Sequence, residues 1–566
     1  MTHRVLSILL LCSFAGLGQP SKARRAPKFT VVEASIADMQ AALKSGRITS
    51  HELVTQYLVR IATYEDKLNA AITVNPHALD EADKLDRERR RGRVRGPLHG
   101  IPIALKDNIH TTDMRTTGGT LAFAGFTPPY EATLAKNLRD AGAIIIAKTT
   151  MTELANWIAS GMPNNFNALA GYAMNPYDPR RDPREATSDG RPALNTGGSS
   201  SGTGTAANFW AANVGTETSG SILSPANQNM LAAIKPTVGR ISRWGVIPIT
   251  ADQDTPGPMA KTVADAAILL GALEGASPDP NDAATSKCTP PRGRDYTRFL
   301  KRNGLRGARI GIPRAFFYEP VTAPGRTSPR GGLSPEQRRV VDEAIAVLKE
   351  HGAVIVDPAD IPSVVTEDPK QNVLLWNTCA GEDGAKGRDE TCSTVFKYGM
   401  KRDFNAWLRT LGPSAPVKTM TELRNFNVAH SLGGAMKYGQ AQLDISDEMN
   451  IDSDRERYQA DLARGIELAG RRGIDAVLKQ HNLDALLFPG ASGYNISATP
   501  GYPTLIVPFG TIPNAPAPPF PEGFDAKPAP FGVSFAGTAC SEPRLIEIGY
   551  AFEQATKRRR PPARFP

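Results

Sequence analysis

Two short apolar runs separated by one amphipathic stretch constrain the fold of this chain more than any other feature. Residues 101–105 (IPIAL) and 143–147 (AIIIA) are each typical of a fully buried strand. Between them, residues 131–141 have helical periodicity and end at Gly142. Strand, helix and strand in succession form the unit of a parallel sheet, because the crossover returns the chain in the same direction. We therefore predict an α/β fold whose sheet is at least partly parallel and is covered by helices.

The rest of the chain continues this alternation. Residues 35–68 have helical periodicity, and residues 49–52 (TSHE) have the pattern of a capping box. A helix after Ser334 and a closing helix over residues 541–554, capped by Ser541, have similar start signals. Residues 360–480 are mainly polar with helical periodicity, which predicts a covering layer. Further buried strands are predicted at residues 309–312, 354–356, 485–488, 504–507 and 532–535.

Length and composition restrict the class of protein. The chain has 566 residues, more than one hydrophobic core usually reaches, so we expect one very large domain or two to three modules. Its 40% hydrophobic residues and mean hydropathy of −0.30 exclude both a multi-span membrane protein and a wholly disordered chain. There is no C-x-x-C pair, and the eight histidines have no metal-binding spacing, so no zinc site is expected.

The formal charge of +9 is concentrated in two short segments, residues 84–95 and 557–560. Such segments can bind nucleic acid or a membrane surface. However, acidic residues alternate with basic ones in the first segment, and neither segment carries aromatic residues that would stack on bases. We therefore expect a solvated helix face and a loose C-terminus, and no nucleic-acid partner.

The first residues have the layout of a signal peptide. A basic head, residues 1–4, precedes an apolar run at residues 5–15 that is too short to span a bilayer, and small residues follow up to Gly18. Cleavage near Gly18 predicts a secreted or periplasmic protein without a membrane span. It would leave four cysteines, an even number that allows disulfides. Cys379 and Cys392 are the nearest pair, and the connectivity stays open.

A run of small residues at 197–204 (GGSSSGTG) follows an irregular loop at residues 163–196. A flexible linker is one interpretation, but a predicted helix start at residues 205–210 follows it instead of a second domain. A dinucleotide-binding fingerprint would need a preceding hydrophobic strand, which residues 189–196 do not provide. A third interpretation is a serine-rich turn at a helix start, where a hydroxyl and several N–H groups can meet a developing anion.

A second run, residues 215–222 (GTETSGSI), places small residues on both sides of Ser221. Small neighbours let the backbone approach a ligand and turn its amides toward one point, as an oxyanion hole requires. No G-x-S-x-G motif and no nearby histidine supports a Ser–His–Asp triad. A serine nucleophile would then need another base. Lys106, at the end of the first apolar run, is either that base or an edge residue whose ammonium reaches solvent; as a base it must be buried, because its usual pKa is about 10.4.

Four blocks of sequence, taken in order, resemble the amidase signature family. They are residues 100–108 (GIPIALKDN), 197–202 (GGSSSG), 215–222 (GTETSGSI) and 235–248 (KPTVGRISRWGVIP). Three further segments look most like its peptide-amidase branch, namely residues 254–259, 501–503 and 549–554. The resemblance covers roughly residues 35–270 and 480–555.

The resemblance implies a three-layer α/β/α sandwich with a large mixed sheet covered by helices. It also implies a Ser–cis-Ser–Lys triad, in which Lys106 is the base, Ser199 the bridging serine held by a cis peptide, and Ser221 the nucleophile. The oxyanion hole of the family matches three backbone amides of this chain, those of Thr218, Ser219 and Gly220.

The chain departs from the family pattern in two places. The stretch from Ser199 to Ser221 is two residues shorter, which leaves the position of the bridging serine open. Leu223 stands where the family usually has an arginine, and Ser224 where an apolar residue is common. We interpret these residues as altered packing or pocket lining rather than lost chemistry.

Together these features predict an exported amidase that hydrolyses carboxamide C–N bonds through a serine acyl-enzyme, with C-terminal peptide amides as candidate substrates. No metal and no cofactor is expected, the partner is a small amide or peptide-amide substrate, and the oligomeric state stays open. After a signal peptide of about residues 1–18, the amidase domain spans residues 30–556, with a poorly matched, mainly helical covering region at 280–480. An aryl-acylamidase or esterase with the same triad, and a non-catalytic binding protein on this fold, remain alternatives. A glutaminyl-tRNA amidotransferase subunit conflicts with the signal peptide.

Overall fold

The computed structural model describes residues 29–187, 189–198, 202–381 and 391–565. Within them, eleven strands form one mixed sheet. In spatial order these strands are β1 (Ala71–Val74), β3 (Ile144–Thr149), β2 (Pro102–Lys106), β6 (Ala212–Glu217), β8 (Thr255–Ala260), β7 (Ala232–Lys235), β16 (Thr504–Ile512), β17 (Ala529–Ala536), β15 (Ala485–Pro489), β9 (Arg309–Gly311) and β12 (Val354–Val356). Three small sheets pair β4 (Phe166–Asn167) with β5 (Gly171–Tyr172), β10 (Pro320–Val321) with β11 (Arg330–Gly331), and β13 (Asn377–Thr378) with β14 (Cys392–Ser393).

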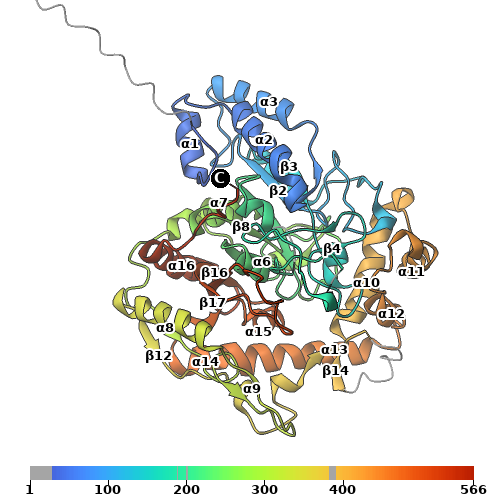
Figure 1. Cartoon of the computed structure of the whole chain (residues 1–566), viewed down its shortest axis with the longest axis vertical. Coiled ribbons are helices and arrows are strands. Elements are labelled where there is room, and N and C mark those ends of the chain that lie inside the picture. The colour runs from blue at the N-terminus through green and yellow to red at the C-terminus, as the bar shows by residue number, and fades with distance from the viewer. Residues whose placement is uncertain (1–28, 188, 199–201, 382–390, 566) are drawn as a thin grey trace, which may run out of the picture.

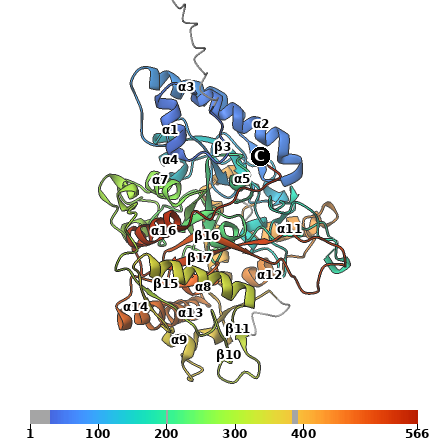
Figure 2. The ribbon, with the colours of Figure 1, turned by 60° about the vertical axis from the view of Figure 1, so that its left-hand side comes forward.

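Helices surround the main sheet (Figure 1). They are α1 (Ile36–Lys44), α2 (Ser50–Leu68), α3 (Ala78–Arg90), α4 (Thr133–Asp140), α5 (Gly202–Ala206), α6 (Leu223–Gln228), α7 (Val263–Leu273), α8 (Pro335–Glu350), α9 (Pro362–Val365), α10 (Val395–Thr410), α11 (Met420–Ala429), α12 (Ala441–Asp447), α13 (Arg455–Gly465), α14 (Asp475–His481), α15 (Tyr494–Ala498) and α16 (Glu542–Thr556). A π-helical segment, Ile466–Ile474, joins α13 to α14. In one covering layer α4, α7, α16 and α8 pack side by side in that order (Figure 2). The predicted α/β class, with a large mixed sheet covered by helices, is confirmed.

The parallel unit predicted from the two apolar runs is present. Strand β2 lies between β3 and β6 and runs parallel to both, so that Ile103 pairs with Ile145 on one side and with Ala212 on the other. All residues of β2 and β3 are buried, which explains their apolar sequences. Gly142, after α4, has φ +84°, and a side chain there would meet the backbone of His99 at 2.9 Å. Glycine is therefore required where the helix turns back into the sheet.

Most of the other predicted elements also form. The capping box at the start of α2 is present, since Thr49 and Glu52 each bond to the other's backbone amide. Ser541 precedes α16 as predicted, but its hydroxyl donates to the carbonyl of Thr538 and makes no cap bond. The helix start expected at residues 205–210 lies three residues earlier, as α5. There Gly204 leaves room for the indole of Trp210, which folds back onto it.

The region 280–480 is only partly a helical cover. Its first part contributes β9 and β12 to one edge of the main sheet, where they run parallel to each other. From α10 onward the region is helical, and α10, α11 and α12 lie together in Figure 1. Buried aromatic side chains of α10, among them Phe404 and Trp407, pack against Phe123 and Phe126 in a second apolar cluster. This cluster attaches the helical part to the loops that follow β2.

The prediction of a loose C-terminus is wrong. Arg559 is buried and donates two hydrogen bonds to the carboxylate of Glu33, at 2.8 and 2.9 Å, and one to the carbonyl of Met230 at 2.7 Å. Phe565 packs its ring against Tyr64 of α2, and Figure 2 shows the C-terminus beside that helix. The partners lie hundreds of residues away in sequence, so the basic run alone could not reveal them. In the other basic segment, residues 84–95, the charges mostly remain on the surface of α3.

Two disulfides join the four cysteines of the described residues. Cys379 bonds to Cys392, the nearest pair in sequence, and Cys288 bonds to Cys540 across a separation of 252 residues. The predicted signal peptide lies outside the described residues. Among those residues, no helix combines the length and the apolar character that crossing a membrane requires.

Candidate active site

Two neighbouring parallel strands end side by side at one edge of the main sheet. Strand β2 ends at Lys106 and β6 ends at Glu217, after which the glycine- and serine-rich turn, residues 218–221, begins. The Nζ of Lys106 donates to the backbone oxygen of Thr216 at 3.1 Å and to its Oγ1 at 3.0 Å. Functional groups of α/β proteins commonly gather at such carboxyl ends of strands. The sheet thus brings together two sequence blocks that lie about 110 residues apart.

Lys106 is fully buried, as a general base at this position requires, so the alternative of a solvent-reaching edge residue is wrong. Burial lowers its pKa from the ordinary 10.5 to about 7, because a buried amine is less costly uncharged. The carboxylates of Asp254 and Glu217 act in the opposite direction. Glu217 ends β6 and Asp254 directly precedes β8, so both carboxylates come from strands on the same side of β2. Burial still dominates, and much of Lys106 is uncharged near neutral pH.

Asp107 points away from this site, as alternation along a strand predicts. Its Oδ2 accepts from the backbone amide of Thr117 at 3.1 Å and from the Thr117 hydroxyl. Its Oδ1 lies 3.5 Å from the Nζ of Lys148, and both side chains are fully buried. The carboxylate is therefore paired on the other face of β2 and leaves Lys106 without an adjacent ion-pair partner from its own strand.

Glu217 fixes the chain on both sides of Ser221. Its Oε2 accepts from the backbone amides of Ile222 at 2.7 Å and Leu223 at 3.0 Å. A carboxylate is favourable at the start of a helix, here α6. Ser221 is only 8% exposed, and its hydroxyl bonds to no other described residue. The hydroxyl is thus held in a fixed place and is free to react.

Three side chains from other parts of the chain hold the turn. Thr218 Oγ1 donates to Asp254 Oδ1 at 2.5 Å, and Gln253 Nε2 donates to the backbone oxygen of Thr218 at 3.2 Å. Ser219 Oγ donates to Asn495 Oδ1 of α15 at 3.3 Å. Burial raises the pKa of Asp254 to about 7, so this carboxyl group titrates in the same range as the lysine.

The backbone of the turn is free to bind an anion. The N–H groups of Ser219 and Gly220 donate to no acceptor in the part of the chain that the structure describes. Gly220 has φ +89°, and a side chain there would meet the ring of Tyr494 at 3.1 Å. A glycine at this position therefore gives the turn a conformation that aims successive amides outward. This is the geometry expected for the oxyanion hole assigned to Thr218, Ser219 and Gly220, and the assignment stays a prediction.

The other glycine- and serine-rich segment lies directly beside Ser221. A methyl group on Gly198 would be 3.5 Å from the Oγ of Ser221. Thr152 fixes this position by donating from its Oγ1 to the backbone oxygen of Gly198 at 2.7 Å. Ser199 follows at once, but residues 199–201 lie outside the described residues. Its bridging role, its bond to Lys106 and the cis peptide therefore stay predictions.

The departure from the family pattern after the nucleophile changes packing. Leu223 is fully buried in an apolar cluster that includes Ile222, Ala226 and Ile506. Leu223 thus has a packing position, and the interpretation that this departure leaves the chemistry intact stays a prediction. Ser224, next in α6, is half-buried.

The described residues offer neither a histidine base nor a metal site. No histidine among them hydrogen-bonds to Ser221. The buried His110 instead accepts from the indole N–H of Trp407 at 3.0 Å, and burial lowers its pKa to about 3. No group of three or more histidine, cysteine or acidic side chains in the described residues could hold a metal ion.

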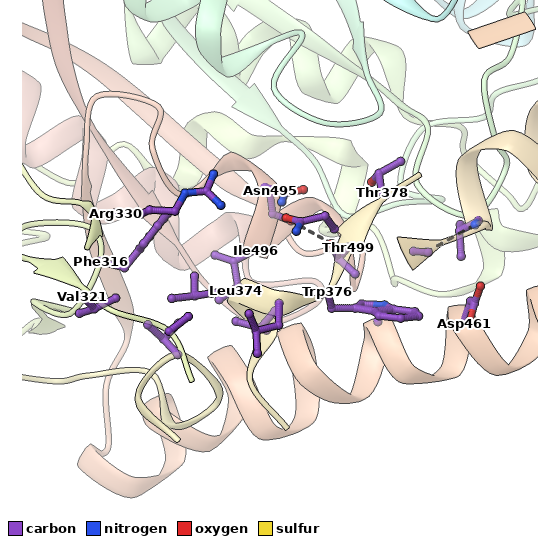
Figure 3. Close-up of a pocket in the computed structure, with 18 of the residues that line it drawn as sticks. Phe316, Val321, Arg330, Leu374, Trp376, Thr378, Asp461, Asn495, Ile496 and Thr499 are labelled. Carbon is purple, nitrogen blue, oxygen red and sulfur yellow. Dashed lines mark hydrogen bonds between the residues drawn. The ribbon is translucent and has the colours of Figure 1, made fainter. Parts of the chain in front are cut away.

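A cavity of about 150 Å³ adjoins the turn (Figure 3). Gln253 and Asn495, which hold residues 218–219, form part of its wall. The rest of the wall contains both apolar and polar side chains and comes from the segments around β10, β11, β13, β14, α13 and α15. Its volume is roughly ten times what one water molecule needs, so it can receive a side chain or more of an organic ligand.

Four residues that shape this site, namely Glu217, Gln253, Asp254 and Asn495, were not predicted from the sequence. Glu217 and Asp254 stand inside or beside blocks that carried the resemblance, so a search of those blocks for buried carboxylates could have found them. Gln253 precedes Asp254 and carries no separate signal. Asn495 lies 276 residues from its partner Ser219 and has no local signal at all.

Comparisons with known proteins agree with this geometry. Residues 52–546 match the Amidase family. The chain is 34% identical to a probable amidase of Arabidopsis thaliana, over 99% of this chain and 97% of the relative. It is 36% identical to the native peptide amidase of Stenotrophomonas maltophilia, with a TM-score of 0.76 over 94% of this chain and 98% of that one. The peptide amidase PAM in complex with the competitive inhibitor chymostatin also has 36% identity, with a TM-score of 0.77 over 94% and 100%.

Proposed function

Since this chain belongs to the amidase family and hydrolyses amide C–N bonds, we propose that its substrates are peptides with a C-terminal carboxamide, which it converts to the free acid and ammonia. Two peptide amidase structures superimpose on nearly the whole chain, which supports this substrate class over other amides. The cavity beside the turn supports it as well, because it offers apolar contacts to the acyl part of a peptide.

One observation carries the catalytic proposal. Lys106 is a fully buried lysine with a pKa of about 7, at the end of the strand next to the Ser221 turn. A buried amine is costly to keep unless it has a chemical task, and an uncharged amine can accept a proton. Nucleophilic catalysis also requires a reactive hydroxyl and available N–H donors, and within the described residues the Ser221 hydroxyl and the amides of Ser219 and Gly220 have no partner.

In the proposed mechanism Lys106 Nζ accepts the proton of Ser199 Oγ while Ser199 accepts that of Ser221. The Oγ of Ser221 attacks the amide carbonyl carbon, and the resulting oxyanion is stabilised by backbone N–H groups of residues 218–220. The proton returns by the same route to the leaving nitrogen, ammonia departs, and an acyl-enzyme remains. Water then attacks the acyl carbon, and its proton follows the same path, which restores Ser221 and releases the acid.

A substrate panel tests the proposal. The substrates compared are an acetylated peptide that ends in leucinamide, and the anilide and the methyl ester of the same acyl group. Their kcat/KM values are measured from the release of ammonia, aniline and methanol, respectively. We expect the highest kcat/KM for the peptide amides. A preference for the aryl amide or the ester would instead indicate an aryl-acylamidase or an esterase.

A fluorophosphonate probe separates catalysis from mere binding. The wild type should be labelled at Ser221, and the Ser221→Ala variant should not be labelled. Absence of both labelling and turnover in the folded wild type would favour the non-catalytic binding protein.

Export is proposed on separate grounds. The basic head and apolar run before Gly18, together with two disulfides, favour an oxidising compartment outside the cytosol. Expression of the full chain in a bacterial host, followed by mass analysis of the periplasmic protein, tests this. A new N-terminus near residue 19 supports export, and a cytosolic protein that retains Met1 contradicts it.

A further inference from the structure

The cavity beside the turn of residues 218–221 has a wall of mixed polarity, in which apolar side chains adjoin polar ones. The apolar part of the wall is formed by Phe316, Phe317, Val321, Leu374, Trp376 and Ile496. Figure 3 shows Phe316 and Val321 beside the hairpin of β10 and β11, Leu374 and Trp376 on the segment before β13, and Ile496 on α15. This part of the wall can contact an apolar side chain of a ligand.

The acyl part of the substrate is the part that reaches this cavity. In the proposed reaction the leaving group is ammonia, so everything that the protein can recognise belongs to the acyl side. Gln253 and Asn495 connect the cavity to residues 218 and 219 by hydrogen bonds. An acyl group bound with its carbonyl at the turn therefore extends along the cavity wall.

Two arginines line the same cavity without an anionic partner. Arg326 and Arg330 come from the segment that joins β10 to β11 and from β11 itself, and both are exposed. Neither guanidinium group makes a hydrogen bond, an ion pair or a cation–π contact within the described residues, although both backbones are bonded in the hairpin. Figure 3 shows Arg330 extending from β11 toward the side of the cavity formed by Asn495 and Ile496.

Asp461, the acidic residue that lines the cavity among the described residues, does not neutralise these arginines. It accepts from the backbone amide and the hydroxyl of Thr394, at 2.9 and 2.8 Å, and forms an ion pair with Arg457 at 3.0 Å. Other arginines nearby are already paired, as Arg314 is with Asp357. In the part of the chain that the structure describes, the cavity thus combines apolar side chains with two guanidinium groups that have no anionic partner.

We propose that the preferred substrate is a peptide amide that carries a carboxylate on its acyl part, upstream of the terminal residue, and that Arg326 and Arg330 bind this carboxylate. The inference rests on the proposed function and deepens it. A guanidinium matches the geometry of a carboxylate with two parallel N–H donors, so an arginine suits the recognition of a carboxylate. A terminal apolar side chain fits the wall, while an acidic side chain one or two residues earlier meets the arginines.

The test uses matched substrates. Acetylated peptide amides that end in leucinamide carry glutamate or glutamine one residue, or two residues, before the leucine. For the wild type at low salt, we expect kcat/KM to be about fivefold higher for the glutamate peptide at one of the two positions, as one exposed ion pair can supply. The preference should shrink as the salt concentration rises.

Variants then assign the preference to the arginines. Arg326→Gln and Arg330→Gln should each reduce the ratio of kcat/KM for the glutamate peptide to kcat/KM for the glutamine peptide, and the double variant should bring this ratio to about 1. Arg330→Glu should favour a lysine peptide over the glutamate one. Arg298→Gln removes one exposed positive charge outside the cavity and should leave the preference unchanged.

The outcomes are distinguishable. Equal rates on the glutamate and glutamine peptides, or a preference that survives in the double variant, overturn this inference and leave the proposed function intact. Hydrolysis of neither peptide by the wild type overturns the proposed function and this inference with it.

Discussion

Replacing Lys106 by methionine should abolish turnover and at the same time stabilise the folded state. The lysine is fully buried, and its pKa falls from 10.5 in ordinary surroundings to about 7 in the fold. At pH 7 the amine of Lys106 is protonated in nearly all unfolded molecules but in only about half of the folded ones. With about 1.4 kcal/mol for each pKa unit, the buried amine costs the fold about 4 kcal/mol at this pH.

The sign of the pH dependence follows from the lowered pKa. The free-energy cost of burying the amine is largest below pH 7. It declines as pH rises from 7 toward 10.5, because the lysine of the unfolded chain also loses its proton, and about 2 kcal/mol remains at pH 9. Methionine is similar in volume and carries no charge, but it gives up the two hydrogen bonds to Thr216, worth about 1 kcal/mol each. The variant should therefore be more stable by about 2 kcal/mol at pH 7 and by almost nothing at pH 9.

Urea unfolding of both proteins at pH 7 and pH 9, together with acylation rates from pH 6 to 9, measures this. The wild-type rate should rise about tenfold from pH 6 to pH 8 and then level off, since only the uncharged amine accepts a proton. Lys106→Arg should not restore activity, because a guanidinium stays protonated. Lys44→Met, on an exposed lysine, should change stability by less than about 0.5 kcal/mol.

A stability difference between wild type and Lys106→Met that is the same at pH 7 and pH 9 would refute the reasoning. Near-normal activity in Lys106→Arg would exclude the lysine as the base. Asp254→Asn provides an internal check, because it removes a carboxylate that favours the charged amine. The rise in rate should then move to lower pH.

Three further predictions address the nucleophile, the C-terminus and the loop beside the cavity. Ser221→Ala should lower kcat by at least about 10⁴-fold with unfolding free energy changed by less than about 1 kcal/mol, and residual activity of a few per cent would contradict its role. Arg559→Leu should lower the free energy of unfolding by about 2–4 kcal/mol, because the carboxylate of Glu33 loses its arginine partner. An unchanged urea midpoint would show that the C-terminal contacts contribute nothing to stability. Replacing both Cys379 and Cys392 by serine should raise KM for peptide amides, because the neighbouring residues Thr378 and Ser393 line the cavity. The same change should lower the free energy of unfolding by up to about 3 kcal/mol. The expectation fails if KM and the unfolding midpoint both stay at wild-type values.

Local sequence was sufficient to predict those helices, strands and turns whose signals lie within a few consecutive residues. The apolar run before Lys106 predicted a buried strand, but whether the lysine at its end is buried or reaches solvent could not be decided from the run itself. The glycines around Ser221 predicted a turn that exposes backbone amides, because only glycine adopts the required conformation without a clash, and Gly220 has the positive φ that this implies. The capping box at Thr49 likewise depends on residues three apart and was predicted correctly.

Only the tertiary structure decided which distant groups meet. The placement of Asp254 beside Lys106, of Asn495 beside Ser219 and of Arg559 beside Glu33 depends on how the sheet and its covering helices pack, and no spacing in the sequence encodes it. The same holds for the cavity, whose wall is assembled from segments separated by more than 200 residues. Hydrophobic periodicity acts within one strand or helix, whereas pKa values, ion pairs and cavities depend on neighbours that the chain brings together only when the whole sheet has formed.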